Sequence, residues 1–316
     1  MLQHVQAHFY FFSSVLAVTL VALLCYGSRS PPPAPPPPPF EPAGWPRPAT
    51  RHVSEAAALQ RAALDARHLP ADAPPECVSW LTSQALLPGF TSQFAQDSTI
   101  YYNFLAGRLA EGGTGFFVDV GANAPKVLSN TYFLEKCLGW KGLCIEADPA
   151  LAAVLRRERT CTVVNKCVDV ARTEVSYVVA GAAGTLGHIA TAQEKGATTV
   201  ACAPLASVLG EHGVKHVDFL TIDIEGNEVS ALLGYDWEAI PIEMLLIESA
   251  WSTEMLDMML SDAGMWRVSD LSYLDDLYVR RTPLLKVPGA TAMRQDNWEF
   301  LRGVEVKDRK SYKRGW

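Results

Sequence analysis

Short apolar runs alternate with helical patterns in the central part of the chain. The runs have the length of buried strands and lie at residues 116–120, 143–145, 162–164, 174–180, 198–201, 217–222 and 242–248. Helical patterns lie between several of them, at residues 130–138, after Pro149, and at residues 205–212 and 253–263. This alternation indicates an α/β domain. We predict a doubly wound, mostly parallel sheet that ends in an antiparallel hairpin, at residues 266–271 and 277–279.

Two further segments belong to the predicted domain. Residues 92–105 have a helical pattern and lead into the first strand. Residues 181–196 are rich in glycine, and we predict that they form a loop over one face of the sheet. This loop contains His188, a weak candidate for catalysis, because a lone loop histidine is more often a solvated surface residue.

The N-terminal part of the chain has a different pattern. Residues 9–26 are apolar and uncharged over about the length that a bilayer core requires, which predicts a single-pass signal anchor. A cleaved signal peptide is the alternative, but no Lys or Arg precedes Phe9. Residues 31–48 begin PPPAPPPPPF and predict a stiff spacer that could also recruit a partner protein. Residues 54–68 predict a helix that is part of a stalk.

These patterns divide the chain into five parts, namely a short N-terminal segment (1–8), a transmembrane anchor (9–26), a proline-rich linker and stalk (27–75), a globular domain (76–285) and a C-terminal extension with a basic tail (286–316). The 316 residues carry a net charge of −7, which gives a nucleic-acid partner no electrostatic support.

Seven cysteines are present, and Cys25 lies in the apolar N-terminal run. No zinc-type Cys or Cys/His spacing occurs, so we expect no metal site. The other six permit disulfides in an oxidising lumen, whereas buried free thiols are the alternative. The sequence does not assign the pairs, which would come from Cys77, Cys137, Cys144, Cys161, Cys167 and Cys202.

Acidic residues end three of the predicted strands. Asp119 and Gly121 lie at the end of the first, and Glu146 follows the second, about 25 residues later, near the spacing of ribose-binding acids. We expect Gly121 to allow a tight turn beside a ligand. Asp223 and Glu225 follow the strand at 217–222, and we expect Asp223 to lie beside the Asp119 loop if the two strands are neighbours. Capping of helices is the structural alternative, which we favour for Glu228.

Several of these stretches together resemble the FkbM-type methyltransferase family. The resemblance rests on FVDVGANAPKVLSNTYFLEKCLGWKGLCIEADP, VDFLTIDIEGNEVSALLGYDW and IPIEMLLIES, with SQFAQD and LDDLYV at the entry and exit, and covers roughly residues 90–280. It implies a Rossmann-like sheet and S-adenosylmethionine as cofactor. The anchor combined with this domain is similar to the Star-type membrane proteins, which are associated with protein trafficking.

The resemblance also implies roles for individual residues. Asp119, Gly121 and Asn123 would form the cofactor loop, Glu146 would bind the ribose hydroxyls, and Asp169 would lie near the adenine. Asp223 and Glu225 would face the methyl group and the acceptor, with one of them as base. The less favoured alternative is that these acids hold a divalent cation, with Asp223, Glu225 and Glu248 as its ligands.

The chain departs from the family pattern at one turn. Where the family commonly has Asn-Asp-Gly, the chain has Asn123-Ala124-Pro125, so an aspartate is lost and a residue with fixed φ replaces glycine. We predict a membrane-anchored O-methyltransferase with an unidentified acceptor, its domain in the lumen of the endoplasmic reticulum or Golgi. The alternative is an inactive descendant that binds or escorts membrane or secreted proteins.

Overall fold

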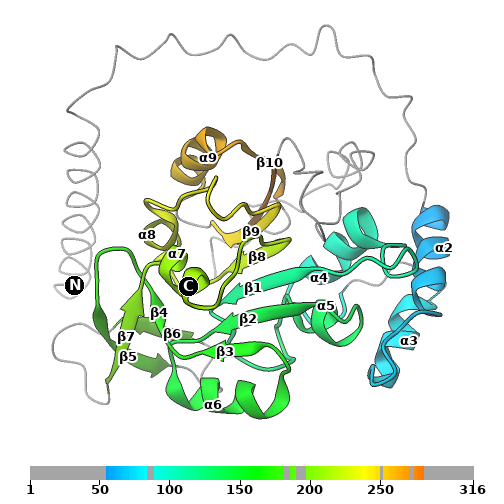
Figure 1. Cartoon of the computed structure of the whole chain (residues 1–316), viewed down its shortest axis with the longest axis horizontal. Helices are drawn as coiled ribbons and strands as arrows, with labels where there is room; N and C mark the ends of the chain where they lie inside the picture. The colour runs from blue at the N-terminus through cyan, green and yellow to red at the C-terminus, as the bar shows by residue number, and fades with distance from the viewer. Residues whose placement is uncertain are drawn as a thin grey trace, which may run out of the picture. The chain divides into compact units, whose positions relative to one another are not determined.

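The computed structural model describes residues 55–83, 89–180, 186–189, 197–249, 252–270 and 274–280 (Figure 1). The chain divides into two units, and all described residues lie in the second, Pro48–Trp316. The predicted anchor, the proline-rich spacer and the basic tail lie outside the described residues. Among the helices that the structure describes, none is long and apolar enough to cross a membrane.

The main element is a seven-stranded sheet with the order β10-β11-β9-β8-β1-β2-β3 (Figure 1). Its strands are β1 (Phe116–Val120), β2 (Lys141–Ile145), β3 (Thr162–Val164), β8 (Phe219–Ile222), β9 (Met244–Glu248), β10 (Met265–Asp270) and β11 (Asp275–Arg280). Five strands are parallel to their neighbours, whereas β11 is antiparallel to β9 and to β10. The predicted mostly parallel sheet with a terminal antiparallel hairpin is confirmed.

The order of the strands reverses at β1. From β1 the chain builds outward to β2 and β3, and then returns to the other side of β1 with β8 and β9. In open α/β sheets a ligand binds outside the carboxyl ends of the strands at such a reversal. The fold therefore predicts a site where β1 and β8 end.

Helices cover both faces of this sheet, which explains the continuous apolar runs of its strands. Phe117, Phe219 and Leu246 point to one face, where the α2 to α5 segment packs. Val118 and Leu220 point to the other face, toward α7, α8 and α9. The helices are α2 (Glu55–Asp65), α3 (Pro75–Leu81), α4 (Gln96–Ile100), the π-helix η1 (Tyr101–Leu105), α5 (Tyr132–Lys136), α6 (Pro149–Glu158), α7 (Leu205–Glu211), α8 (Glu228–Leu232) and α9 (Thr253–Asp262).

A second sheet of four strands was not predicted. Its order is β4-β7-β5-β6, and its strands are β4 (Cys167–Val168), β5 (Glu174–Ala180), β6 (Leu186–Ile189) and β7 (Thr198–Ala203). Strand β6 lies inside the glycine-rich segment that we predicted as a loop, so that prediction was wrong for these four residues. Glycine lowers strand propensity, but it keeps both backbone groups that pair β6 with β5.

Helix α2 belongs to the domain and is not part of a separate stalk. Ala58 and Ala62 are buried in the core. Asp65, at the end of the helix, accepts hydrogen bonds from the Tyr101 hydroxyl at 2.8 Å and from the Gly107 amide at 2.7 Å. The helix that the sequence analysis assigned to the stalk therefore packs into the core and is held there by one buried carboxylate.

Three disulfides join the six cysteines that follow the predicted anchor. Cys77 of α3 is bonded to Cys137 beside α5, Cys144 of β2 to Cys161 beside β3, and Cys167 of β4 to Cys202 of β7, across sequence separations of 60, 17 and 35 residues. The sequence left open whether these cysteines form disulfides or remain buried free thiols. The structure contains disulfides.

Candidate active site

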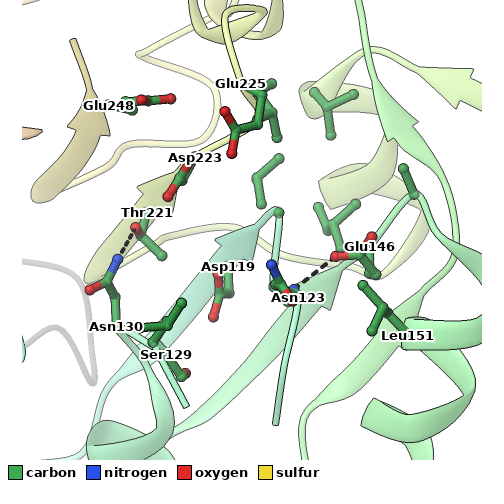
Figure 2. Close-up of a pocket in the computed structure, with 18 of the residues that line it drawn as sticks. Asp119, Asn123, Ser129, Asn130, Glu146, Leu151, Thr221, Asp223, Glu225 and Glu248 are labelled. Atoms are coloured by element: carbon green, nitrogen blue, oxygen red, sulfur yellow. Dashed lines mark hydrogen bonds between the residues drawn. The ribbon is translucent and has the colours of Figure 1, made fainter. Parts of the chain in front are cut away.

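A pocket of about 390 Å³ lies at the carboxyl edge of the main sheet (Figure 2). Residues that follow β1, β2, β8 and β9 line it, together with residues of the second sheet. Most of the predicted site residues are among them, namely Asp119, Gly121, Asn123, Glu146, Asp223 and Glu225. The expectation that Asp223 lies beside the Asp119 loop is confirmed, because β1 and β8 are neighbours and the Asp223 amide donates to the Val120 carbonyl at 3.0 Å.

One row of residues runs across this edge of the sheet. Val120 pairs in register with Ile145 of β2 and with Ile222 of β8. Ile222 pairs in turn with Ile247 of β9. The residues that follow these four strand positions therefore lie in one row, in the order Glu146, Gly121, Asp223 and Glu248.

The row extends to β11, where Asp275 pairs with Glu248. Residues in one row of a sheet point to the same face, so these side chains share one surface. Strands lie about 4.8 Å apart, which separates the backbones of Glu146 and Glu248 by about 14 Å. Four carboxylates thus lie along one edge, with a glycine at the end of β1 between Glu146 and Asp223.

Gly121 is required by the protein itself at this position. Its φ is +85°, and a Cβ built on it would lie 1.9 Å from the Asp223 carbonyl oxygen. We expected glycine to leave room for a ligand. The structure shows that the room is taken by the end of β8, so glycine allows two strand ends to approach each other.

Asp119 is held by a hydrogen bond and by a nearby positive charge. The Thr131 hydroxyl donates to Asp119 Oδ2 at 2.5 Å. Burial raises the pKa of Asp119, and the Arg159 guanidinium and the Thr131 hydrogen bond oppose the increase. The carboxylate lies beneath the loop at residues 121–125 and lines the pocket, so it can contact a ligand that reaches β1.

Arg159 connects the loop at residues 121–125 to α5. Its side chain is fully buried, and Nε donates to Glu135 Oε2 at 2.8 Å. Nη2 donates to Thr131 Oγ1 at 2.9 Å, and Nη1 donates to the Pro125 carbonyl at 3.2 Å. The atypical Ala124-Pro125 turn is therefore anchored by a side chain that the sequence analysis did not identify.

Glu146 is the centre of a second set of hydrogen bonds. Oε2 accepts from the Asn123 amide at 2.8 Å, and Oε1 accepts from the Asp148 amide at 2.7 Å (Figure 2). Burial raises the pKa of Glu146, and these two donors oppose the increase. A carboxylate has about four acceptor positions, so both oxygens retain capacity for donors from a ligand. The Ala124-Pro125 turn leaves Asn123 in contact with Glu146.

Asp223 and Glu248 are neighbouring carboxylates that favour protonation. The Asp223 side chain is open to the pocket but surrounded by protein and acidic groups. Burial and then the charge of Asp275 raise its pKa. Burial and then the charge of Asp223 raise the pKa of Glu248, whose Oε2 has no hydrogen-bond partner among the described residues. This pair can take up a proton near neutral pH.

Glu225 lies on a turn with an unusual backbone. Its φ is +56°, which is uncommon for a residue other than glycine. Glu228 Oε1 accepts from the amides of Ile224 and Gly226 at 3.0 and 3.1 Å, so it fixes the turn that presents Glu225 to the pocket. The structural role that we favoured for Glu228 is thus observed, and Glu225 remains the accessible carboxylate.

Asp169 has a structural role in the turn after β4. It does not line the pocket, although its neighbours Cys167 and Val168 do. Its Oδ1 accepts from the Ala171 and Arg172 amides at 2.8 Å. The carboxylate is nearly fully buried and stabilises the turn after β4, so we assign it no cofactor contact in the proposal below.

Several pocket residues were not identified from the sequence. Gln96 Nε2 donates to Asp275 Oδ2 at 2.8 Å, and both residues line the pocket. They lie within SQFAQD and LDDLYV, so the resemblance already pointed to these segments. Tyr177 also lines the pocket, but it belongs to the unpredicted second sheet.

The fold and the pocket together define an α/β protein of the Rossmann-like class, with a ligand site where the strand order reverses. Residues 119–265 match the family model described as the methyltransferase FkbM domain. The match indicates that the chain contains a methyltransferase domain. No curated protein matches the chain.

Among solved structures, the chain is similar to the methyltransferase FkbM from Methylobacillus flagellatus KT, with 16% sequence identity and a TM-score of 0.32. The alignment covers 72% of this chain and 59% of the length of that structure. The comparisons give no support to the Star-like membrane-anchored layout.

Proposed function

We propose that the chain is an S-adenosylmethionine-dependent methyltransferase that methylates a hydroxyl group of an acceptor still to be identified. The observation that carries the proposal is the row Glu146, Gly121, Asp223 and Glu248 at the point where the strand order reverses. The cofactor would lie along this row, with its ribose at Glu146 and its methyl group near Asp223.

The pocket offers the groups that this cofactor requires. Its volume is within the usual range for small-molecule sites. Three buried acceptors have no partner in the part of the chain that the structure describes, namely Oδ1 of Asn123, Oδ1 of Asn130 and Oε2 of Glu248. Buried acceptors are normally satisfied, so a ligand that brings N–H and O–H donors fits the site. The ribose hydroxyls and the ammonium group of the cofactor are such donors.

Methyl transfer requires the protein mainly to align the acceptor with the methyl group and to remove a proton from the acceptor. The cofactor supplies an activated methyl group when bound. The residues of the chain would orient the acceptor oxygen in line with that group. Asp223, with Glu225 as the second candidate, would accept the hydroxyl proton, and the raised pKa of Asp223 brings it closer to the value of an effective general base.

Calorimetric titration with S-adenosylmethionine tests this proposal. The full-length chain should show saturable binding, and Asp119→Asn and Glu146→Ala should each weaken it strongly. Because α2 packs into the core of the domain, the titration should use a chain that retains residues from Glu55 onward. No binding at millimolar cofactor would contradict the proposal and favour the alternative, an inactive methyltransferase-like protein that binds or escorts other proteins.

Three disulfides support the proposed location of the domain. Disulfides persist in oxidising compartments and are rare in the cytosol. With the predicted anchor at residues 9–26, we propose a single-pass membrane protein whose domain lies in the lumen of the endoplasmic reticulum or Golgi. Protease protection of sealed membrane vesicles tests this topology, since a luminal domain is degraded only after detergent is added. We also propose that residues 31–39 bind a partner protein. Deletion of this segment should disrupt the complex with that partner and leave the domain intact.

A further inference from the structure

The pocket has both apolar and polar lining groups. Its aliphatic and aromatic side chains include Ile145, Leu151, Val168, Ile224 and Tyr177. Carboxylates and amides, from Asp223, Glu248, Asp275, Gln96 and Asn130, also line it. Figure 2 shows Glu146 and Leu151 on one side of the pocket and Glu248 and Asn130 on the other. A ligand that fills the pocket therefore meets both apolar and polar groups.

Tyr177 is the only aromatic residue among the described residues that line the pocket. It belongs to β5 of the second sheet and is half-buried. Burial and then the charges of Glu146 and Asp148 raise its pKa, and Tyr177 and Glu146 line the same pocket. The hydroxyl stays protonated and can donate a hydrogen bond in the pocket.

The second sheet fixes the backbone at Tyr177. Strand β5 pairs with β7 over Glu174–Tyr177. Strand β7 is joined to β4 by the disulfide between Cys167 and Cys202. Cys167 also lines the pocket. The strand that carries Tyr177 is therefore hydrogen-bonded to a strand that is covalently linked to another part of the pocket lining.

We propose that Tyr177 is a cofactor-binding residue, whose ring covers the nucleobase of the cofactor while the ribose contacts Glu146. This inference rests on the proposed function. An aromatic ring that lines a pocket offers a stacking surface for a flat base, and bases stack on such rings without requiring specific hydrogen bonds. Asp169 is occupied by the turn after β4, so packing on Tyr177 replaces the adenine contact that the family resemblance assigned to Asp169.

Titration of the full-length chain with S-adenosylhomocysteine tests the inference. Tyr177→Ala should weaken binding at least about tenfold, because it removes the stacking surface. Tyr177→Phe should retain the affinity within a few-fold. The matched control is Ser176→Ala, the adjacent exposed position on β5, which should bind like the wild type.

Hydrogen exchange of the wild-type chain gives a second readout that needs no variant. Addition of S-adenosylhomocysteine should slow amide exchange in β5, Glu174–Ala180. If the wild type binds the ligand while Tyr177→Ala binds equally well, or while exchange in β5 is unchanged, the inference is overturned and the proposed function stands. If the wild type does not bind, the proposed function fails and this inference fails with it.

Discussion

The Cα of Gly121 faces the carbonyl oxygen of Asp223, and a Cβ at position 121 would lie only 1.9 Å from that oxygen. This contact joins the end of β1 to the end of β8, the two strands between which the site is built. The glycine therefore determines how closely the loop after β1 approaches the strand that presents Asp223.

Gly121→Ala should disrupt this approach. The added methyl group requires the two strand ends to separate, and φ at +85° adds backbone strain, so we expect a loss of about 2 kcal/mol or more in the free energy of unfolding. Chemical denaturation measures it. Gly213→Ala is the control, because φ there is +69° and the Cβ would meet no atom within 4 Å, so only the backbone cost of about 1 kcal/mol is expected. Equal losses in the two variants would show that the contact does not constrain β1 and β8.

Arg159→Met should strongly destabilise the domain. It removes the buried guanidinium that pairs with Glu135 and leaves Lys136, at 3.1 Å, as the nearby cation, so we expect a cost of about 3 kcal/mol, at the lower end of the range for a broken buried pair. Arg157→Met, in an exposed pair with Glu158, should cost less than about 1 kcal/mol. Adding Glu135→Leu to Arg159→Met should restore part of the stability, because no buried charge then lacks a partner. A double variant no more stable than Arg159→Met would contradict the account.

The stability of the apo protein should depend on pH through the Asp223 and Glu248 pair. Both pKa values are raised in the folded chain, first by burial and then by neighbouring carboxylates. The folded state therefore binds more protons than the unfolded state, and this pair's contribution to stability is lost as pH rises from about 4 through the raised values. Glu248→Gln removes one charge of the pair.

Thermal unfolding across pH 4–8 tests this expectation. The melting temperature of Glu248→Gln should approach that of the wild type at low pH and exceed it increasingly as pH rises. Glu238→Gln, at an exposed position, should show no such trend relative to the wild type. Parallel curves for Glu248→Gln and the wild type would mean that the two carboxylates do not repel each other.

The three disulfides predict a defined peptide map. Under non-reducing conditions, digestion should yield the pairs Cys77–Cys137, Cys144–Cys161 and Cys167–Cys202. Replacing both Cys144 and Cys161 by alanine should lower the free energy of unfolding by about 3 kcal/mol, because a loop of 17 residues is no longer closed in the unfolded chain. Alkylation of any of these six cysteines in denatured, unreduced protein would contradict the pairing.

The sequence predicted the main sheet because its strands are buried on both faces and read as continuous apolar runs. The same argument placed Asp119, Glu146 and Asp223 at strand ends. The second sheet was missed because β4 has two residues and β6 lies among glycines, so neither has an apolar signal. Strand β4 forms by pairing with the distant β7, and β6 forms by pairing back on β5 in an antiparallel hairpin.

Arg159 is a single side chain whose burial could not be predicted from the sequence. It follows two other arginines in the segment RRERT, and only the folded chain shows that Arg157 is exposed while Arg159 is buried against Glu135. Likewise, Asp275 joins the carboxylate row only through its pairing with Glu248 across an antiparallel strand. Such relationships depend on tertiary register, which local patterns do not contain.

The direction of the cofactor along the row is the central claim, and the structure of the chain in complex with S-adenosylhomocysteine tests it most directly. The account predicts that the ribose hydroxyls donate to Glu146, that the base lies against Tyr177, and that the sulfur faces Asp223. A ligand bound elsewhere, or bound in this pocket with its base at Asp223 and Glu248, would contradict it.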